Sequence, residues 1–190
     1  MELRGLRYFI GFVVVIGLLI FLIVLIFGGG GDSKKVPESS RTLSSYAQSD
    51  SQVSLTIDGV ENSASEHRQV VIAVNSDRVL YEVKAGYNGD VIDSKTFSNS
   101  TASYTAFLLA LEHANFTKGD LKHKTADPRG YCPLGQRFIF ELTDKGSSIE
   151  RFWSTSCGKP KTFFGDLGTN LALFENQVPR YHDLVDDVAL

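Results

Sequence analysis

The chain has 190 residues, of which 43% are apolar, with two cysteines and a formal net charge of −3. This composition excludes a disordered chain, a collagen-like or heptad fibre and a small domain stapled by many disulfides. Residues 28–190 carry a net charge of −4, which argues against nucleic acid as a partner.

The apolar residues are concentrated near the amino terminus. Residues 8–27 hold 18 apolar residues and no charged one, whereas residues 28–190 are about 37% apolar. A helix of 20 residues is about 30 Å long, which matches the hydrocarbon core of a bilayer. The sequence therefore predicts a single-pass transmembrane helix over 8–27, of the signal-anchor type, preceded by a short cytoplasmic segment of residues 1–7.

Two other interpretations of residues 8–27 stay open. A cleaved signal peptide usually has a shorter apolar region that ends at a small-residue cleavage site, whereas this segment runs into four glycines at 28–31. A helix buried inside a soluble protein would need apolar surroundings on every side, which the rest of this chain is too small to supply. Basic residues flank the segment about equally, so they do not set its orientation.

Residues 28–52 are rich in glycine and serine and contain only four apolar residues. Such a segment buries too little apolar surface to offset the entropy lost on ordering. We expect a flexible tether over 28–52 and a folded domain over 53–190. The basic pair Lys34 and Lys35 is read as solvated charge, because lipid-binding segments carry four to eight basic residues.

The first part of the domain has strand patterns and then a helix pattern. Residues 67–86 predict a β-hairpin that turns at Ser76-Asp77, with six apolar side chains sharing one face in the pairs Val74 with Val79, Ile72 with Tyr81 and Val70 with Val83. Residues 91–97 predict a further strand. Capping residues at 98–100 then precede apolar residues at helical spacing, namely Tyr104, Phe107, Leu108, Leu111 and Ala114.

A second hairpin is predicted after a polar loop over 117–131. It turns at Asp144-Lys145-Gly146, and pairing Asp144 with Ser147 sets Leu142 against Ile149 and Phe138 against Trp153. The same pairing sets Glu141 against Glu150, an unfavourable contact that indicates either an exposed face or a shifted register.

Two helical segments complete the chain. The apolar residues of 163–174 predict a packed helical region, and Pro179 suits the first turn of a last short helix. The predicted fold class is α+β, a mainly antiparallel sheet covered on one face by helices, in the order ββ(β)αββα(α).

Cys132 and Cys157 flank the second hairpin, close enough in the predicted register for a disulfide. Because disulfides persist in oxidising compartments, this pair favours a domain outside the cytoplasm with the amino terminus inside. A pair of free thiols in a cytoplasmic domain is the alternative.

No cofactor or metal site is expected. The cysteines stand 25 positions apart, and the histidines His67, His113, His123 and His182 lack ligand spacing. No nucleophile elbow, phosphate-binding loop or zinc-protease motif occurs.

The sequence thus favours a single-pass protein of the cell membrane, held in the lipid bilayer by residues 8–27. It would present a small non-catalytic domain for binding an unidentified ligand or envelope protein, or for organising the envelope. The alternative is a membrane-tethered, hydrolase-like enzyme with a site near loop 117–131, built from His123, Asp127 and Arg129. A sensor is a third class, but the seven residues before the span would then need a separate output protein.

Overall fold

The computed structural model describes residues 41–123 and 127–190, which form one compact unit. The predicted span 8–27 and most of the predicted tether lie outside these residues. The elements are η2 (Leu43–Gln48), β1 (Ser51–Asp58), β2 (Arg68–Val74), β3 (Arg78–Ala85), β4 (Asp90–Ser98), α2 (Thr101–His113), β5 (Arg137–Asp144), β6 (Ser147–Thr155), α3 (Leu167–Glu175) and α4 (Tyr181–Val185).

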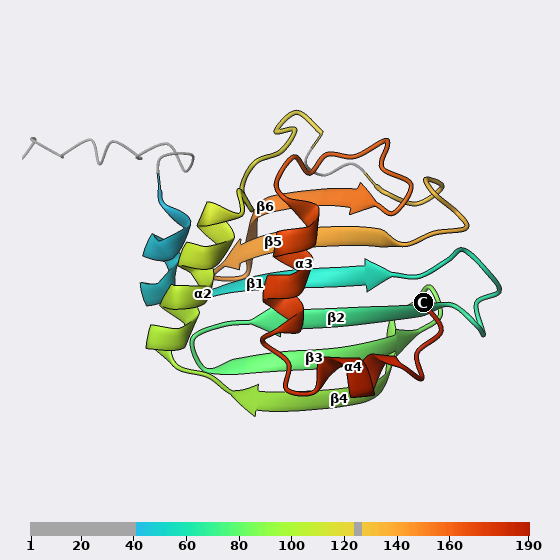
Figure 1. Ribbon diagram of the computed structural model, residues 1–190, viewed down its shortest axis with the longest axis horizontal. Helices are drawn as coiled ribbons and strands as arrows, with labels where there is room; N and C mark the ends of the chain where they lie inside the picture. The colour runs from blue at the N-terminus through green and yellow to red at the C-terminus, as the bar shows by residue number, and fades with distance from the viewer. Residues whose placement is uncertain (1–40, 124–126) are drawn as a thin grey trace, which may run out of the picture. The chain divides into compact units, whose positions relative to one another are not determined.

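The six strands form one antiparallel sheet in the order β4-β3-β2-β1-β5-β6, and the helices pack on one of its faces (Figure 1). This confirms the predicted α+β class. Alternate residues of the strands point into a shared core, for example Leu55 of β1, Ile72 of β2 and Phe140 of β5. Phe174 of α3 and Tyr181 of α4 cover that core, with Phe174 beside Phe140.

The hairpin of β2 and β3 has the predicted register, with Val74 opposite Val79, Ile72 opposite Tyr81 and Val70 opposite Val83. Asn75 fixes the turn, because its side-chain oxygen accepts hydrogen bonds from the backbone N–H groups of Asp77 and Arg78. The predicted strand over 91–97 corresponds to β4, and Ser100 caps α2 by accepting a hydrogen bond from the N–H of Ser103.

The folded unit begins earlier than the sequence predicts. Residues 41–52, assigned above to the tether, contain η2 and the start of β1. Leu43, Tyr46 and Ala47 share one face of η2 and are buried, and η2 packs beside α2. These three apolar residues, together with the pairing of Ser51 and Gln52 with β5, hold this polar segment on the domain.

The central strand β1 is absent from the predicted elements. Its residues alternate as expected of a strand, with Val53, Leu55 and Ile57 buried. It pairs with β2 on one side and with β5 on the other, so it joins the two halves of the sheet.

The predicted register of the second hairpin is wrong beyond its turn. Asp144 does pair with Ser147, but a bulge at Leu142/Thr143 then sets Leu142 against Glu150 in place of Ile149, and Phe138 against Ser154 in place of Trp153. The shift replaces the Glu141–Glu150 contact with the pair Glu141–Arg151, which has opposite charges.

The phenol of Tyr104 on α2 makes the stability of the fold depend on pH in the alkaline range. It is buried, lies 3.0 Å from the Ser51 hydroxyl, and burial raises its pKa to about 12. The folded state thus favours the protonated phenol, so stability is full below pH 10 and is lost as the pH rises from 10 towards 12.

We expect Tyr104→Phe to lose less stability than the wild type between pH 10 and pH 12, because the variant lacks the buried phenol whose ionisation destabilises the fold in this range. Chemical unfolding of the full chain in detergent, repeated at several pH values, measures this slope. Equal slopes for the two proteins would contradict the assignment.

Candidate functional site

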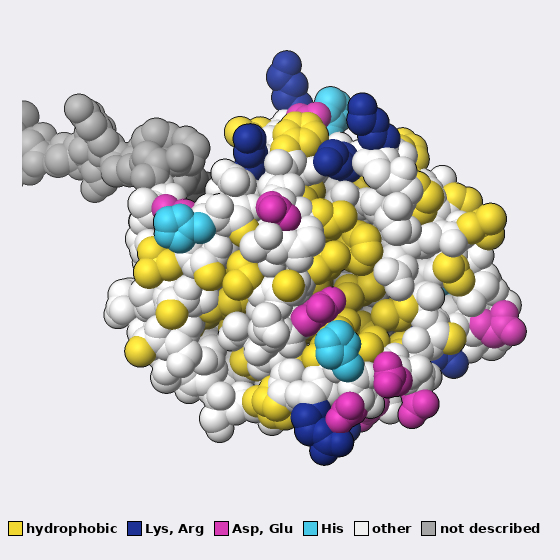
Figure 2. Space-filling view, in the orientation of Figure 1, with side chains coloured by type: hydrophobic (Ala, Val, Ile, Leu, Met, Phe, Trp, Pro, Cys, Tyr) yellow, Lys and Arg dark blue, Asp and Glu magenta, His cyan; other side chains and the backbone are white. Residues whose placement is uncertain are grey.

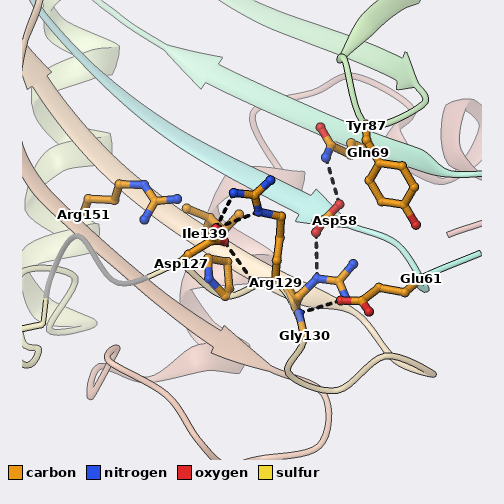
Figure 3. Close-up of a pocket in the computed structure, with 11 residues that line it drawn as sticks. Asp58, Glu61, Gln69, Tyr87, Asp127, Arg129, Gly130, Ile139 and Arg151 are labelled. Carbon is orange, nitrogen blue, oxygen red and sulfur yellow. Dashed lines mark hydrogen bonds and ion pairs between the residues drawn. The ribbon is translucent and has the colours of Figure 1, made fainter. Parts of the chain in front are cut away.

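A polar pocket of about 610 Å³ opens on the sheet face that carries no helix (Figure 3). The strands supply its floor and the loops its walls. Its lining consists of Asp58, Glu61, Gln69, Tyr87, Asp127, Pro128, Arg129, Gly130, Arg137, Ile139 and Arg151. Strand alternation explains the floor, because Arg137 and Ile139 point away from the core that Phe138 and Phe140 enter.

Arg137 is the anchor of the pocket and is only 1% exposed. Its Nε donates to Asp58 Oδ2 at 2.7 Å, its Nη1 donates to Glu61 Oε1 at 3.0 Å, and its Nη2 donates to the carbonyl oxygen of Gly59. One guanidinium therefore holds two carboxylates and a backbone carbonyl, which fixes the start of β5 against the end of β1.

His67 completes this network from behind the pocket. It is fully buried, with Nδ1 3.0 Å from the carbonyl oxygen of Val60 and Nε2 2.9 Å from Asp58 Oδ1. Both ring nitrogens of His67 therefore face oxygen atoms, one from the backbone and one from the Asp58 carboxylate. Gln69 Nε2 donates to the same Asp58 oxygen at 2.9 Å.

Tyr87 forms an aromatic wall at the rim. Its ring stacks on His67 with centroids 4.1 Å apart, and its hydroxyl donates to the carbonyl oxygen of Asn62 at 2.8 Å. The side chain is 50% exposed although it is held at both ends. It therefore presents a fixed, accessible aromatic surface to the pocket.

The opposite wall contains Asp127 between two arginines. Asp127 accepts hydrogen bonds from the backbone N–H and from Nε of Arg129, at 3.0 and 2.7 Å. These bonds, helped by the charges of Arg129 and Arg151, lower the pKa of Asp127. Arg151 extends towards Asp127 from β6 (Figure 3).

The bulge between β5 and β6 is what brings Arg151 to this face. In the register predicted from the sequence, Arg151 would pair with Phe140 and enter the core. The bulge pairs it with Glu141 instead, on the same face as Ile139 and Arg137. Bulges commonly redirect side chains in this way beside functional sites.

Several contacts hold the loop wall against the sheet. Cys132 and Cys157 form the disulfide that the sequence predicts, with Cα atoms 5.8 Å apart. The ring of Tyr131 stacks on Trp153 with centroids 5.4 Å apart. The N–H of Glu61 donates to the carbonyl oxygen of Pro133 at 2.7 Å, so the two loops that flank the pocket are joined directly.

The three residues of the enzyme alternative do not all meet. Asp127 and Arg129 line the pocket, whereas His123 is not among its lining residues. The His123 side chain is 68% exposed, and its Nδ1 lies 2.8 Å from Asp120 Oδ2. Within residues 41–123 and 127–190, no group of three or more His, Cys, Asp or Glu side chains has the arrangement of a metal site.

Several other residues that line the pocket could not be identified as site residues from the sequence. Asp58 ends β1, a strand that the sequence does not predict, and Glu61 lies in the loop after it, whereas the position of Arg151 depends on a bulge. Arg137 is a polar residue beginning a strand pattern, and such residues are usually exposed. The alternation in 137–141 marks the face of Arg137, but its burial depends on partners about 80 residues away.

In the described part of the chain, no helix is both long enough and apolar enough to cross a membrane. The chain matches no protein-family model and no curated protein.

Proposed function

We propose that this chain is a membrane-anchored binding module that captures a small polar ligand without net charge in the pocket on the helix-free face. The anchor is the predicted span 8–27, with residues 1–7 inside and the domain outside the cytoplasm. The observation that supports ligand capture is the rigid polar lining, in which three arginines are balanced by three carboxylates.

The balance of charge suggests the class of ligand. Arg137 is held by Asp58 and Glu61, and Arg129 is held by Asp127, so the lining offers no net attraction for an ion. Hydroxyl, amide or zwitterionic groups can exchange hydrogen bonds with these side chains at the pocket surface. The Tyr87 ring adds an apolar contact for one face of such a ligand.

Binding suits the pocket better than catalysis. A general acid or base has to change its protonation state near neutral pH. Asp127 has a lowered pKa, and the Asp58 and Glu61 carboxylates accept hydrogen bonds from one buried guanidinium. These groups are suited to hold a ligand in one orientation. The hydrolase-like alternative keeps one supporting observation, the position of Asp127 and Arg129 in the pocket wall.

Ligand capture can be tested by thermal unfolding of the full chain in detergent. The probes are neutral mono- and disaccharides, free amino acids and dipeptides. We expect one of these classes to raise the melting temperature of the wild type, since a ligand at 100 times its Kd adds about 2.7 kcal/mol. Tyr87→Ala and Arg129→Gln should lose the shift.

The matched control is Arg180→Gln, since Arg180 is also an exposed arginine paired with an aspartate but lies on the helix-covered side near α4. It should keep the shift in full. The proposal fails if no probe shifts the wild type, or if the pocket variants respond as the control does. Turnover of a probe that Asp127→Asn abolishes would favour the enzyme alternative.

The orientation of the domain can be tested by thiol labelling of intact cells that express the full chain. We expect no alkylation of Cys132 or Cys157 without reductant, and labelling by a membrane-impermeant reagent after reduction. Free thiols that react only after the cells are permeabilised would place the domain in the cytoplasm.

A further inference from the structure

Basic side chains gather at one end of the domain, over the loops that follow α2 and β6 (Figure 2). Segments 118–123 and 159–164, here called the basic end, carry four lysines and one aspartate. All four lysines, Lys118, Lys122, Lys159 and Lys161, are exposed. Asp120 is engaged by His123 and by the backbone N–H of Lys122.

Backbone pairing holds the two segments side by side. The N–H of Phe164 donates to the carbonyl oxygen of Lys118 at 2.8 Å, and the N–H of Asp120 donates to that of Thr162 at 2.8 Å. Gly119 between them packs on the ring of Phe152, where a Cβ would come within 2.3 Å of a ring carbon. These backbone hydrogen bonds and the packing of Gly119 therefore fix the shape of the basic end.

Two large apolar side chains are exposed among these lysines. Leu121 is 60% exposed and Phe164 is 48% exposed. Exposed apolar side chains surrounded by lysines are typical of surfaces that lie at the headgroup level of a membrane.

The chain enters the domain at the same end. The N–H of Ser44 lies 3.4 Å from Glu112 Oε2, near the end of α2, and Lys118 follows six residues later. Figure 1 shows η2 beside α2 along its length. Between the predicted span and Arg41 there are 13 residues, and a chain of that length spans at most about 45 Å.

We propose that the basic end docks on anionic phospholipid headgroups, with Leu121 and Phe164 inserted at the boundary between headgroups and acyl chains. This inference rests on the proposed membrane anchor, which keeps the domain close to the bilayer. Each lysine near an anionic surface strengthens binding about fivefold, so the four lysines together would favour one orientation of a tethered domain.

The test uses the full chain in nanodiscs of phosphatidylcholine alone or with 30% phosphatidylglycerol. Lysine acetylation is read residue by residue by mass spectrometry. We expect acetylation of Lys118, Lys122, Lys159 and Lys161 to fall at least threefold in the anionic nanodiscs and to recover in 1 M salt. Lys95 on β4, which is 41% exposed, serves as the internal control and should not change.

Two variants sharpen the test. The first variant carries both Lys118→Glu and Lys161→Glu, and it should abolish the protection of Lys122 and Lys159 from acetylation. The second carries both Leu121→Ser and Phe164→Ser, and it should weaken this protection. The matched control is the charge reversal Lys95→Glu, which should leave the protection of the basic end from acetylation unchanged. Equal acetylation in both nanodiscs, or a fall shared by Lys95, would overturn the proposal, as would protection that appears only when nucleic acid or another protein is added.

Failure of docking and failure of the anchor give different results. If the chain stays with both kinds of nanodisc through gel filtration but shows no lipid-dependent protection, docking is wrong and the anchor stands. If the chain leaves both kinds of nanodisc, the anchor is wrong.

Discussion

Arg137→Met is expected to lower the free energy of unfolding by about 3 to 5 kcal/mol, the usual cost of removing one partner of a buried ion pair. The substitution keeps the side-chain volume but leaves Asp58, which is 5% exposed, without its guanidinium. It also removes the guanidinium hydrogen bonds to Glu61 and to the Gly59 carbonyl, so the loop after β1 loses two of its contacts with β5. Denaturant unfolding followed by the fluorescence of the single tryptophan, Trp153, measures the change.

The control is Arg129→Met, which removes an exposed guanidinium from the same pocket and should leave the unfolding midpoint unchanged. A second check is the pair Arg137→Met with Asp58→Asn. It should be more stable than Arg137→Met alone, because no buried carboxylate is then left without its guanidinium partner. Equal midpoints for Arg137→Met and Arg129→Met would show that the buried network does not support the fold.

Phe140→Ala should have a comparable effect, a loss of about 3 to 5 kcal/mol. Phe140 is 1% exposed, and its ring lies 4.4 Å from that of Phe163 and 6.0 Å from that of Phe116, measured between centroids. It also meets Phe174 of α3. Truncation leaves a cavity where the sheet, the loops after α2 and β6, and α3 converge.

Phe164→Ala is the matched control for this substitution. The two phenylalanines differ in burial, and Phe164 is 48% exposed. Its truncation should cost less than about 1 kcal/mol, as surface substitutions usually do. If Phe140→Ala destabilised the chain no more than Phe164→Ala, the aromatic cluster around α3 would not be the main core of the helix-covered face.

Local patterns were sufficient for the parts of the fold that local contacts decide. The β2–β3 hairpin follows from the alternation of apolar residues around a turn with Asn75 and Asp77, and α2 follows from a cap and an apolar stripe. The disulfide follows from the position of both cysteines beside one hairpin. In these cases the interacting residues are close in sequence or on one predicted element.

The remaining features depend on contacts that no local pattern contains. η2 is folded because α2, which is more than 50 residues away, covers its apolar face. The β5–β6 bulge exchanges a Glu–Glu contact for a Glu–Arg contact. The like-charge pair in the ideal hairpin register indicated an exposed face or a shifted register, but it did not show where the bulge lies. The pocket needs β1, β2, β5, β6 and three loops at once, so its residues could not be grouped before the strand order was known.

The place of β1 in the sheet also has a consequence for how the domain folds. Strands β2, β3 and β4 pair as neighbours in sequence, whereas β1 meets β5 about 80 to 90 residues later. Pairings of such high contact order are slow to form and limit folding rates. During synthesis, β1 therefore has one unpaired edge until β5, at residues 137–144, has emerged. We expect the chain to be most prone to aggregation, or to binding by a chaperone, while this strand edge is exposed.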